Sequence, residues 1–215
     1  MPDHLDTATS IIAFDALRDA RVSATPYPHA LIPQLLREEH LAAVVADFPD
    51  IRKGGSFNLS DVECRGAFAT LIGELKSDAF RDCLAGKFEL DLADKPVAIT
   101  LRGYSRAKAD GHIHTDSKSK LITVLIYLNP SWAEDTGRLR LLNSQRIDDA
   151  FAEVPPSPGS TVIFKVTENG WHGYLPFEGV RRSIQLNFLT SGASAARHRL
   201  LHGFSAMFKG KRGRM

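Results

Sequence analysis

Cysteine is scarce in this chain, and both cysteines, Cys64 and Cys83, lie in sequence with helical character. Two cysteines do not make the disulfide framework on which small secreted domains depend. We therefore expect two buried, reduced thiols and a cytoplasmic location, because thiols stay reduced in that compartment.

Long hydrophobic runs and a surplus of one charge are also missing. No apolar run approaches the roughly 18 residues that a membrane-spanning helix needs, and residues 1–10 carry acids instead of the basic start of a secretory signal. We therefore expect no membrane partner. The formal net charge of +2 argues neither for nor against nucleic acid, and we do not expect a nucleic-acid partner.

The chain has no internal repeat, and its 215 residues predict one domain, large enough for a hydrophobic core. We expect mainly helical support in residues 1–95, a β-rich core in residues 96–190 and a basic tail in residues 191–215. Such a tail is typical of a solvated chain end; contact with a phosphate-rich partner is the alternative. No feature of the sequence predicts an oligomeric state.

Hydrophobic residues at helical spacing predict the elements of the first part. Pro49 ends one helix, Ser77 or Asp78 caps another, and Gly86 is expected at the C-terminal end of that helix. Residues 30–36 fit either a strand or the first turn of a helix. The expected helices cover residues 11–22, 38–47, 64–76 and 78–85.

From about residue 97 onward, β-branched and aromatic residues alternate, and turn residues recur at short intervals. Helices first and strands after is an α+β pattern, in which we expect the strands to close into a sandwich or small barrel with the helices packed on one sheet. The expected strands cover residues 97–102, 113–115, 121–128, 138–142, 161–166, 171–175 and 182–189.

Three side chains in this β-rich part could meet on one metal ion. His114 and Asp116 lie two residues apart in an expected strand, so their side chains point the same way. His172 follows a later β-rich stretch and supplies a second imidazole. Two histidines and one carboxylate bind one face of an Fe(II) ion and leave the opposite face open, as oxygen chemistry requires.

A cation for a carboxylate co-substrate is available on the last expected strand. Arg181 and Ser183 lie two residues apart, so both can face one cavity, and an arginine binds a carboxylate through two parallel hydrogen bonds. Arg182 would then point the other way, into solvent or a surface ion pair. The choice between the two arginines rests on the phase of the strand, which a slip of one residue would reverse.

Taken together, these motifs resemble the double-stranded β-helix, or jelly-roll, core of the 2-oxoglutarate- and Fe(II)-dependent dioxygenases, most closely the prolyl 4-hydroxylase-like branch. The resemblance covers roughly residues 97–189, and residues 27–48 and 80–92 look like helices that precede the core in that branch. The ordered set carries the resemblance, since any single motif is common. The matching motifs are His114-x-Asp116, Leu-Ile-Thr-Val-Leu-Ile-Tyr-Leu-Asn at 121–129, Thr136-Gly137-Arg-Leu, Pro158-Gly-Ser-Thr-Val-Ile-Phe, Trp171-His172-Gly173-Tyr-Leu-Pro176 and Gly179-Val-Arg181-Arg-Ser183-Ile.

The resemblance implies an enzyme that uses Fe(II), 2-oxoglutarate and O2, with ascorbate as a further candidate. The family's reaction couples oxidative decarboxylation of 2-oxoglutarate, giving succinate and CO2, to oxidation of an unactivated C–H bond, usually hydroxylation. The unidentified substrate would be a small molecule or a peptidyl residue, with proline one candidate. The implied iron ligands are His114, Asp116 and His172. The implied co-substrate residues are Arg181 at the distal carboxylate, Ser183 and Tyr127 beside it, and Tyr104 and Thr123 in the pocket wall.

Two other interpretations of the same residues stay open. Gly-His112-Ile-His114 also places two histidines on one side of a strand, which would suit a cupin-type metalloenzyme that does not use 2-oxoglutarate. In the main interpretation His112 is exposed or supports a ligand from behind. A non-catalytic binding module that keeps the β-helix fold is the alternative outside enzymes.

Overall fold

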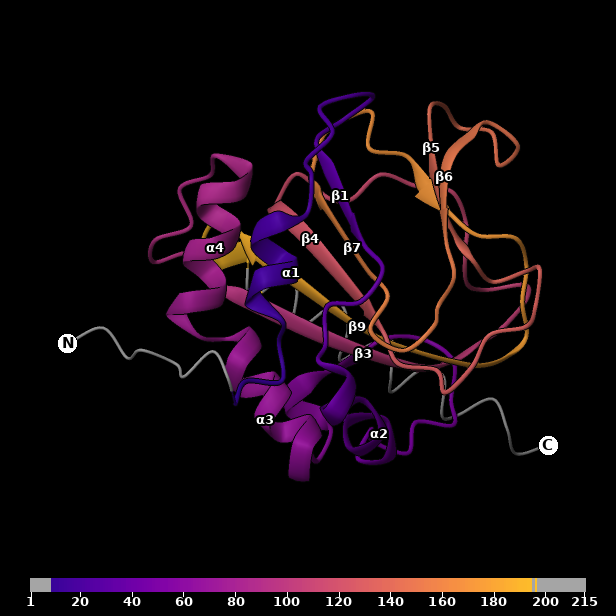
Figure 1. The fold of residues 1–215 in the computed structure, drawn as a ribbon. Helices are drawn as coiled ribbons and strands as arrows, with labels where there is room; N and C mark the ends of the chain where they lie inside the picture. Colours follow the sequence, from indigo (N-terminus) through magenta and orange to yellow (C-terminus); the bar gives the residue numbers. More distant parts are fainter. Residues whose placement is uncertain (1–8, 195, 197–215) are drawn as a thin grey trace.

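Two antiparallel sheets pack against each other in the computed structural model, which describes residues 9–194 and 196 (Figure 1). The larger sheet has the order β1-β7-β4-β9-β3-β2, and the smaller has the order β6-β5-β8. The strands of the larger sheet are β1 (His29–Ile32), β2 (Phe57–Asn58), β3 (Val97–Ser105), β4 (Lys120–Tyr127), β7 (Thr161–Lys165) and β9 (Gly179–Leu189). Those of the smaller sheet are β5 (Leu139–Leu142), β6 (Ala150–Val154) and β8 (His172–Gly173).

From β4 onward the chain passes back and forth between the two sheets: β4 belongs to the larger, β5 and β6 to the smaller, β7 to the larger, β8 to the smaller and β9 to the larger. An isolated bridge between His114 and His172 adds the segment before β4 to the same pattern, beside β8. This winding is that of a double-stranded β-helix. The predicted α+β class and jelly-roll core are confirmed.

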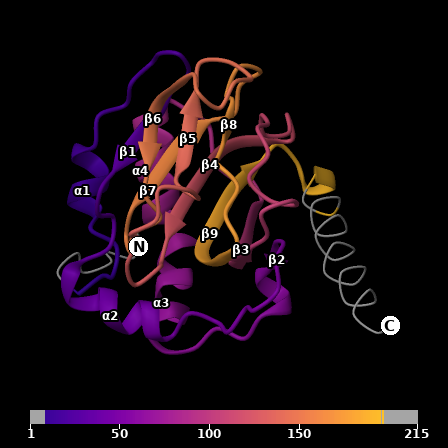
Figure 2. The same ribbon diagram turned by 90° about the vertical axis from the view of Figure 1, so that its right-hand side faces the viewer.

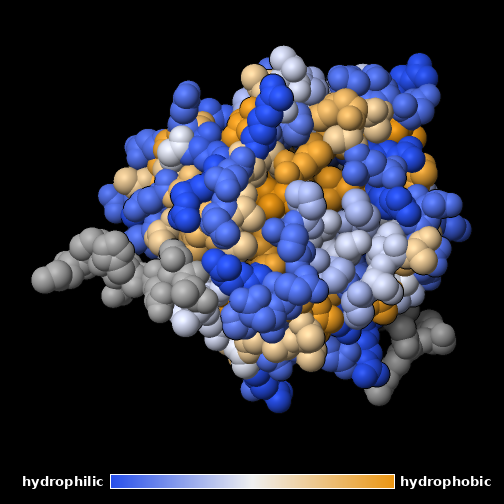
Figure 3. Space-filling view, viewed as in Figure 1, coloured by the Kyte–Doolittle hydropathy of each residue, from blue (hydrophilic) through white to orange (hydrophobic). Residues whose placement is uncertain are grey.

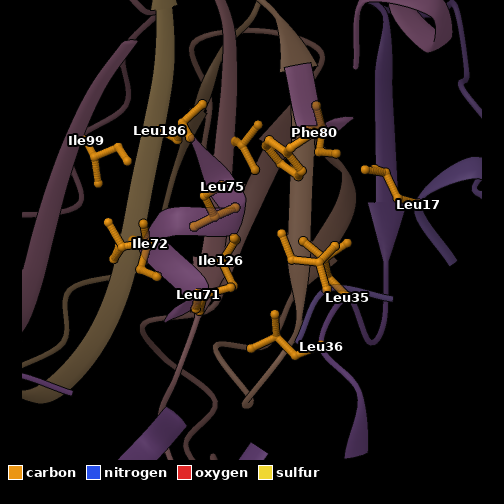
Figure 4. Close-up of a cluster of buried hydrophobic side chains, with 14 of the residues drawn as sticks. Leu17, Leu35, Leu36, Leu71, Ile72, Leu75, Phe80, Ile99, Ile126 and Leu186 are labelled. Carbon is orange, nitrogen blue, oxygen red and sulfur yellow. The ribbon is translucent and has the colours of Figure 1, made fainter. Parts of the chain in front are cut away.

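The helices cover the outer face of the larger sheet because one face of each central strand is apolar (Figures 1 and 2). In β4, Ile122, Val124 and Ile126 are completely buried in the cluster that includes the helices, whereas Thr123 and Tyr127 face the other way. Figure 4 shows this cluster between helices and sheet. The helices are α1 (Phe14–Asp19), α2 (Glu38–Ala46), a 3-10 turn (Leu59–Asp61), α3 (Gly66–Leu75) and α4 (Asp78–Phe88).

A buried carboxylate ties the start of the described chain to the helices. Glu74 in α3 is 7% exposed and accepts hydrogen bonds from the backbone N–H groups of Ile11 and Ile12, each at 2.8 Å. Since buried amides need partners, Glu74 supplies the acceptors for these two amides.

The predicted helix boundaries are wrong where packing overrides the local pattern. Helix α1 is shorter than the predicted 11–22 because Ile12 forms a β-bridge instead. Helix α4 continues to Phe88, which is 2% exposed in the core. The left-handed position after it is therefore Glu89, with φ of 51°, and not the predicted Gly86. The Ser77 cap is confirmed, since its hydroxyl accepts a hydrogen bond at 3.2 Å from the backbone N–H of Phe80 in the first turn of α4.

Among the strands, the ambiguous residues 30–36 contribute to β1, and the predicted strand 113–115 is reduced to the bridge at His114. β6 was not predicted, because most of its side chains are exposed or half-buried and give little alternation. The remaining predicted strands are present with shifted ends.

The surface of the described part is largely hydrophilic on the face that carries the helices, with smaller hydrophobic areas between (Figure 3). None of the helices there combines the length and the apolar character that crossing a bilayer requires. Cys64 and Cys83 are free thiols, half-buried instead of buried as predicted. Most of the predicted basic tail lies outside the described residues.

Candidate metal and co-substrate site

The two histidines of the predicted metal site face each other across a backbone bridge. The His114 N–H donates to the His172 carbonyl and the His172 N–H to the His114 carbonyl, both at 3.0 Å, and the ring centroids lie 4.3 Å apart. Ligand atoms of His114, Asp116 and His172 all lie within 4.8 Å of one another. Backbone pairing thus positions two of the three side chains through main-chain bonds alone.

The hydrogen bonds of the two imidazoles leave the same ring nitrogen of each free. His114 Nδ1 lies 2.8 Å from the carbonyl oxygen of His112, and His172 Nδ1 lies 2.9 Å from that of Gly170. A carbonyl oxygen can only accept, so Nδ1 carries a proton, and in the neutral ring Nε2 then keeps its lone pair. Neutral imidazoles with Nε2 available are the form that binds a divalent metal.

The charge states of the other groups also suit a metal. Burial lowers the pKa of His172 to about 4, against an opposing effect of Asp116, so the ring is uncharged at neutral pH. Burial alone would raise the pKa of Asp116, but the Lys120 ammonium, 2.6 Å from Oδ1, outweighs it and lowers that pKa. Asp116 is therefore a carboxylate.

Arg181 is a buried guanidinium, 4% exposed, that has no carboxylate partner among the described residues. Its Nε donates to the Gly137 carbonyl at 2.8 Å, and its Cζ lies 4.0 Å from the ring centroid of Tyr174 and 5.0 Å from that of Tyr127. Leaving a charge buried and unpaired is costly. The surroundings of Arg181 are therefore suited to an anionic ligand.

A single cavity joins this guanidinium to the histidines. It lies between the two sheets, and its lining includes His114, His172, Tyr127, Arg181 and Ser183. Burial raises the pKa of Tyr127 despite the opposing effect of Arg181, so the phenol keeps its proton. The cavity thus offers metal-type ligands, a cation and a hydroxyl donor in one space.

The phase of β9 is the one that the main interpretation requires, since Arg181 and Ser183 face the cavity. Arg182 points to the opposite face, as predicted. It does not simply extend into solvent or form a surface ion pair, which was the rest of the prediction. It donates to the Val45 carbonyl at 3.2 Å, and its Cζ lies 5.5 Å from the ring centroid of Phe48. Helix α2 thus covers this arginine.

Two of the predicted pocket residues lie elsewhere. Thr123 is completely buried and donates to Asp116 at 2.5 Å; it is not part of the cavity lining. Tyr104 lines a separate hollow beside Arg182, because a bulge between Arg102 and Tyr104 shifts the phase of β3. A contact between Tyr104 and the co-substrate stays a prediction, and this geometry gives it no support.

Among the lining residues that were not predicted are three with polar side chains. Arg102 is half-buried and donates to the buried Asp110 at 2.9 Å, so Asp110 is more than the turn residue that its position suggests. Tyr174 stacks on Arg181. Gln185 continues the polar series at alternate positions of β9, and that alternation was a usable signal.

Comparison with known proteins bears on the β-rich part. Residues 100–189 match the family model described as the 2OG-Fe(II) oxygenase superfamily. This chain carries a 2OG-Fe(II) oxygenase domain. The oxygenase domain makes the protein an Fe(II)- and 2-oxoglutarate-dependent dioxygenase, which needs Fe(II), 2-oxoglutarate and O2. No curated protein matches the sequence.

Solved structures resemble the oxygenase in fold. A Pseudomonas putida prolyl-4-hydroxylase is 18% identical, with a TM-score of 0.53, over 83% of this chain and 97% of the other. The viral collagen prolyl hydroxylase of Paramecium Bursaria Chlorella virus-1, solved with 2OG, is 13% identical, with a TM-score of 0.53, over 76% and 96%. A Trichoplax adhaerens prolyl hydroxylase in complex with a peptide fragment is 18% identical, with a TM-score of 0.52, over 80% and 86%. At these identities the likeness is one of fold.

The donor set of the oxygenase fits Fe(II). Two imidazole nitrogens and a carboxylate oxygen are the ligands of facial iron sites, and here His172 is uncharged at neutral pH and Asp116 is a carboxylate. The Lys120 ammonium pairs with Asp116 and balances the charge of its carboxylate.

Proposed function

We propose that His114, Asp116 and His172 hold the iron of this dioxygenase. The assignment is supported by the convergence of the three ligand atoms and by the free Nε2 of each histidine. The observation that carries the proposal is that a buried arginine without a carboxylate partner lines the same cavity as two of these ligands. An iron site and an anion site in one cavity are what this reaction needs.

Arg181 would bind the distal carboxylate of 2-oxoglutarate. Its Nη2 now lies 3.4 Å from the Tyr127 hydroxyl, a long contact, so a carboxylate would gain strong charge-assisted hydrogen bonds there. Tyr127, which stays protonated, can donate to the same carboxylate, and Ser183 lies in the same wall.

When bound, Fe(II) would activate O2 and bind the keto acid end of 2-oxoglutarate, so that 2-oxoglutarate, O2 and a C–H substrate give succinate, CO2 and a hydroxylated product. The side chains of this protein supply orientation. The backbone bridge between His114 and His172 fixes two ligands, and Arg181 fixes the far end of the co-substrate.

The substrate would be a small molecule or a peptidyl residue. The likeness of fold to prolyl hydroxylases, one of them solved with a peptide fragment, supports peptidyl proline as the first substrate to test. Incubation with proline-containing peptides and 2-oxoglutarate should give a peptide heavier by one oxygen atom. Succinate formation that no such peptide stimulates would exclude this substrate class.

The test of the site is an anaerobic titration of Fe(II) and then 2-oxoglutarate, followed through the weak visible charge-transfer band of the complex. Arg181→Met should weaken 2-oxoglutarate binding roughly 100-fold, equivalent to about 3 kcal/mol, while Fe(II) binding is retained. Arg182→Met, next along the same strand but on the opposite face, is the matched control. Equal effects of the two variants would remove Arg181 from the co-substrate site.

The cupin-type alternative predicts a different result in the same titration. There His112 would be a ligand, and 2-oxoglutarate would not matter. His112 is exposed and does not belong to the converging ligand group, which favours the three-residue site. Metal binding without any charge-transfer band would favour the cupin-type site, and no metal binding at all would favour the binding module.

We also infer a cytoplasmic location, supported by two unpaired cysteines, which persist in a reducing compartment. We propose further that residues 1–95 support the catalytic core of residues 96–190 within one domain, since one hydrophobic cluster contains side chains of both parts.

A further inference from the structure

A line of buried polar side chains runs along the inner face of the larger sheet to Asp116. Thr123 of β4 and Asn187 of β9 are opposite each other in the strand pairing, and both are completely buried. Asn187 Nδ2 lies 2.7 Å from Thr123 Oγ1, which lies 2.5 Å from Asp116 Oδ2. Buried polar groups in such a line are costly unless each has a partner.

The direction of these hydrogen bonds follows from the chemistry of the groups. A carboxylate oxygen only accepts, so the single Thr123 proton must point at Asp116. Thr123 Oγ1 is then free to accept from the Asn187 amide nitrogen. Gln185 Nε2 donates to Asn187 Oδ1 at 3.2 Å, which fixes the orientation of that amide. The donors therefore run in one direction, from Gln185 through Asn187 and Thr123 to Asp116.

The second oxygen of Asp116 is also held. Lys120 Nζ lies 2.6 Å from Oδ1, and the Asp116 side chain is 6% exposed. With one partner on each oxygen, the carboxylate has a single orientation. Each oxygen still has a lone pair for a metal, since a carboxylate has about four acceptor positions.

We propose that Thr123 and Asn187 are positioning residues, which orient the Asp116 carboxylate for the metal. This rests on the proposed role of Asp116 as an iron ligand. It also gives Thr123 a different task from the predicted one, because the hydroxyl contacts a metal ligand and not the co-substrate. Gln185 lines the cavity, so the same line of hydrogen bonds connects the co-substrate space to Asp116.

The test is the affinity of the whole protein for Fe(II), measured by anaerobic titration, together with the visible spectrum of the Co(II)-loaded protein. Thr123→Val keeps the shape of the side chain and removes the hydroxyl. We expect metal affinity to fall roughly 10- to 100-fold, as on loss of other groups that orient a metal ligand, and the Co(II) bands to shift. Thr123→Ser, which restores the hydroxyl, should restore both.

Thr161→Val is the matched control. Thr161 is equally buried, but its hydroxyl donates to the Gly159 carbonyl at 3.0 Å, away from the site. Its loss should leave metal affinity and the Co(II) spectrum unchanged. Asn187→Leu, which touches neither the metal nor Asp116, should weaken metal binding in the same direction as Thr123→Val, and it decides the matter if Thr123→Val does not fold.

Unchanged metal affinity in Thr123→Val, or in Asn187→Leu where the former does not fold, would overturn the proposal, as would an equal loss in Thr161→Val. Asp116→Ala separates this failure from failure of the proposed function. If Asp116→Ala abolishes metal binding and Thr123→Val does not weaken it, only the positioning role is wrong. If Asp116→Ala binds the metal normally, the ligand assignment itself is wrong.

Discussion

At the scale of single residues, the site combines charges that would be costly alone. The side chains of Asp116 and Lys120 are largely shielded from solvent, 6% and 11% exposed, and each neutralises the other. Arg181 has no such partner in the described part of the chain. In the metal-free protein the charge of Asp116 is thus neutralised, whereas the charge of Arg181 is not. The two charges therefore affect stability differently.

Replacing Lys120 tests whether its charge stabilises the Asp116 carboxylate. In metal-free Lys120→Met the Asp116 charge is left buried without its partner, so we expect the free energy of unfolding to fall by roughly 3–5 kcal/mol, measured by urea denaturation. Saturating Mn(II), which supplies a positive charge to the same carboxylate, should recover much of the loss. A loss that Mn(II) does not change would mean that the metal does not replace Lys120 as the counter-charge of Asp116.

His172 should make the metal-free protein sensitive to moderate acid. Its pKa is lowered from the ordinary 6.5 to about 4, first by burial. Between these values the unfolded chain binds a proton that the folded protein does not, so stability is complete above pH 6.5 and falls as the pH falls toward 4, by about 3 kcal/mol.

The check is urea denaturation of metal-free protein across that interval, with His172→Gln as the control. The variant should lack this part of the pH dependence. The Asp116 carboxyl, whose pKa is lowered by Lys120 against the effect of burial, contributes below its ordinary value of 3.8 and does not confuse the measurement. Parallel curves for both proteins would contradict the assignment of the effect to His172.

At the scale of secondary structure elements, Glu74 of α3 holds the preceding segment of the chain through two hydrogen bonds. Glu74→Ala would leave the backbone amides of Ile11 and Ile12 buried without acceptors. We expect a loss of about 3 kcal/mol in the free energy of unfolding, since each unsatisfied group costs about 1–3 kcal/mol. Glu63→Ala, at a side chain that is 75% exposed, should have little effect.

The strands also show which features of the cavity can be predicted from the sequence and which cannot. In β4 and β9 one face packs on helices and the other faces the cavity, so a period of two in the sequence assigns residues such as Arg181 and Ser183 to the correct side. The bulge in β3 breaks that period, and no residue type marks it, so the alternation alone does not place Tyr104. Partners distant in sequence, such as Asn187 for Thr123, depend on strand register, which alternation alone does not give.

At the scale of the whole molecule, the cavity lies between the two sheets, so a co-substrate bound there would contact both. With Mn(II) already bound, 2-oxoglutarate at about 100 times its dissociation constant should stabilise the folded state by about 2.7 kcal/mol more, or roughly 5–10 °C in melting temperature for a protein of this size. Arg181→Met should respond to Mn(II) but gain nothing from 2-oxoglutarate. An equal response of both proteins would contradict binding at Arg181.

The larger hydrophobic cluster lies between the helices and the outer face of the large sheet, while only a smaller one lies between the two sheets. Folding and chemistry therefore depend on opposite sides of the same strands. Replacements on the inner side can alter which molecule is oxidised while the side that stabilises the protein keeps its packing. The larger hydrophobic cluster is thus out of reach of most changes to the cavity lining.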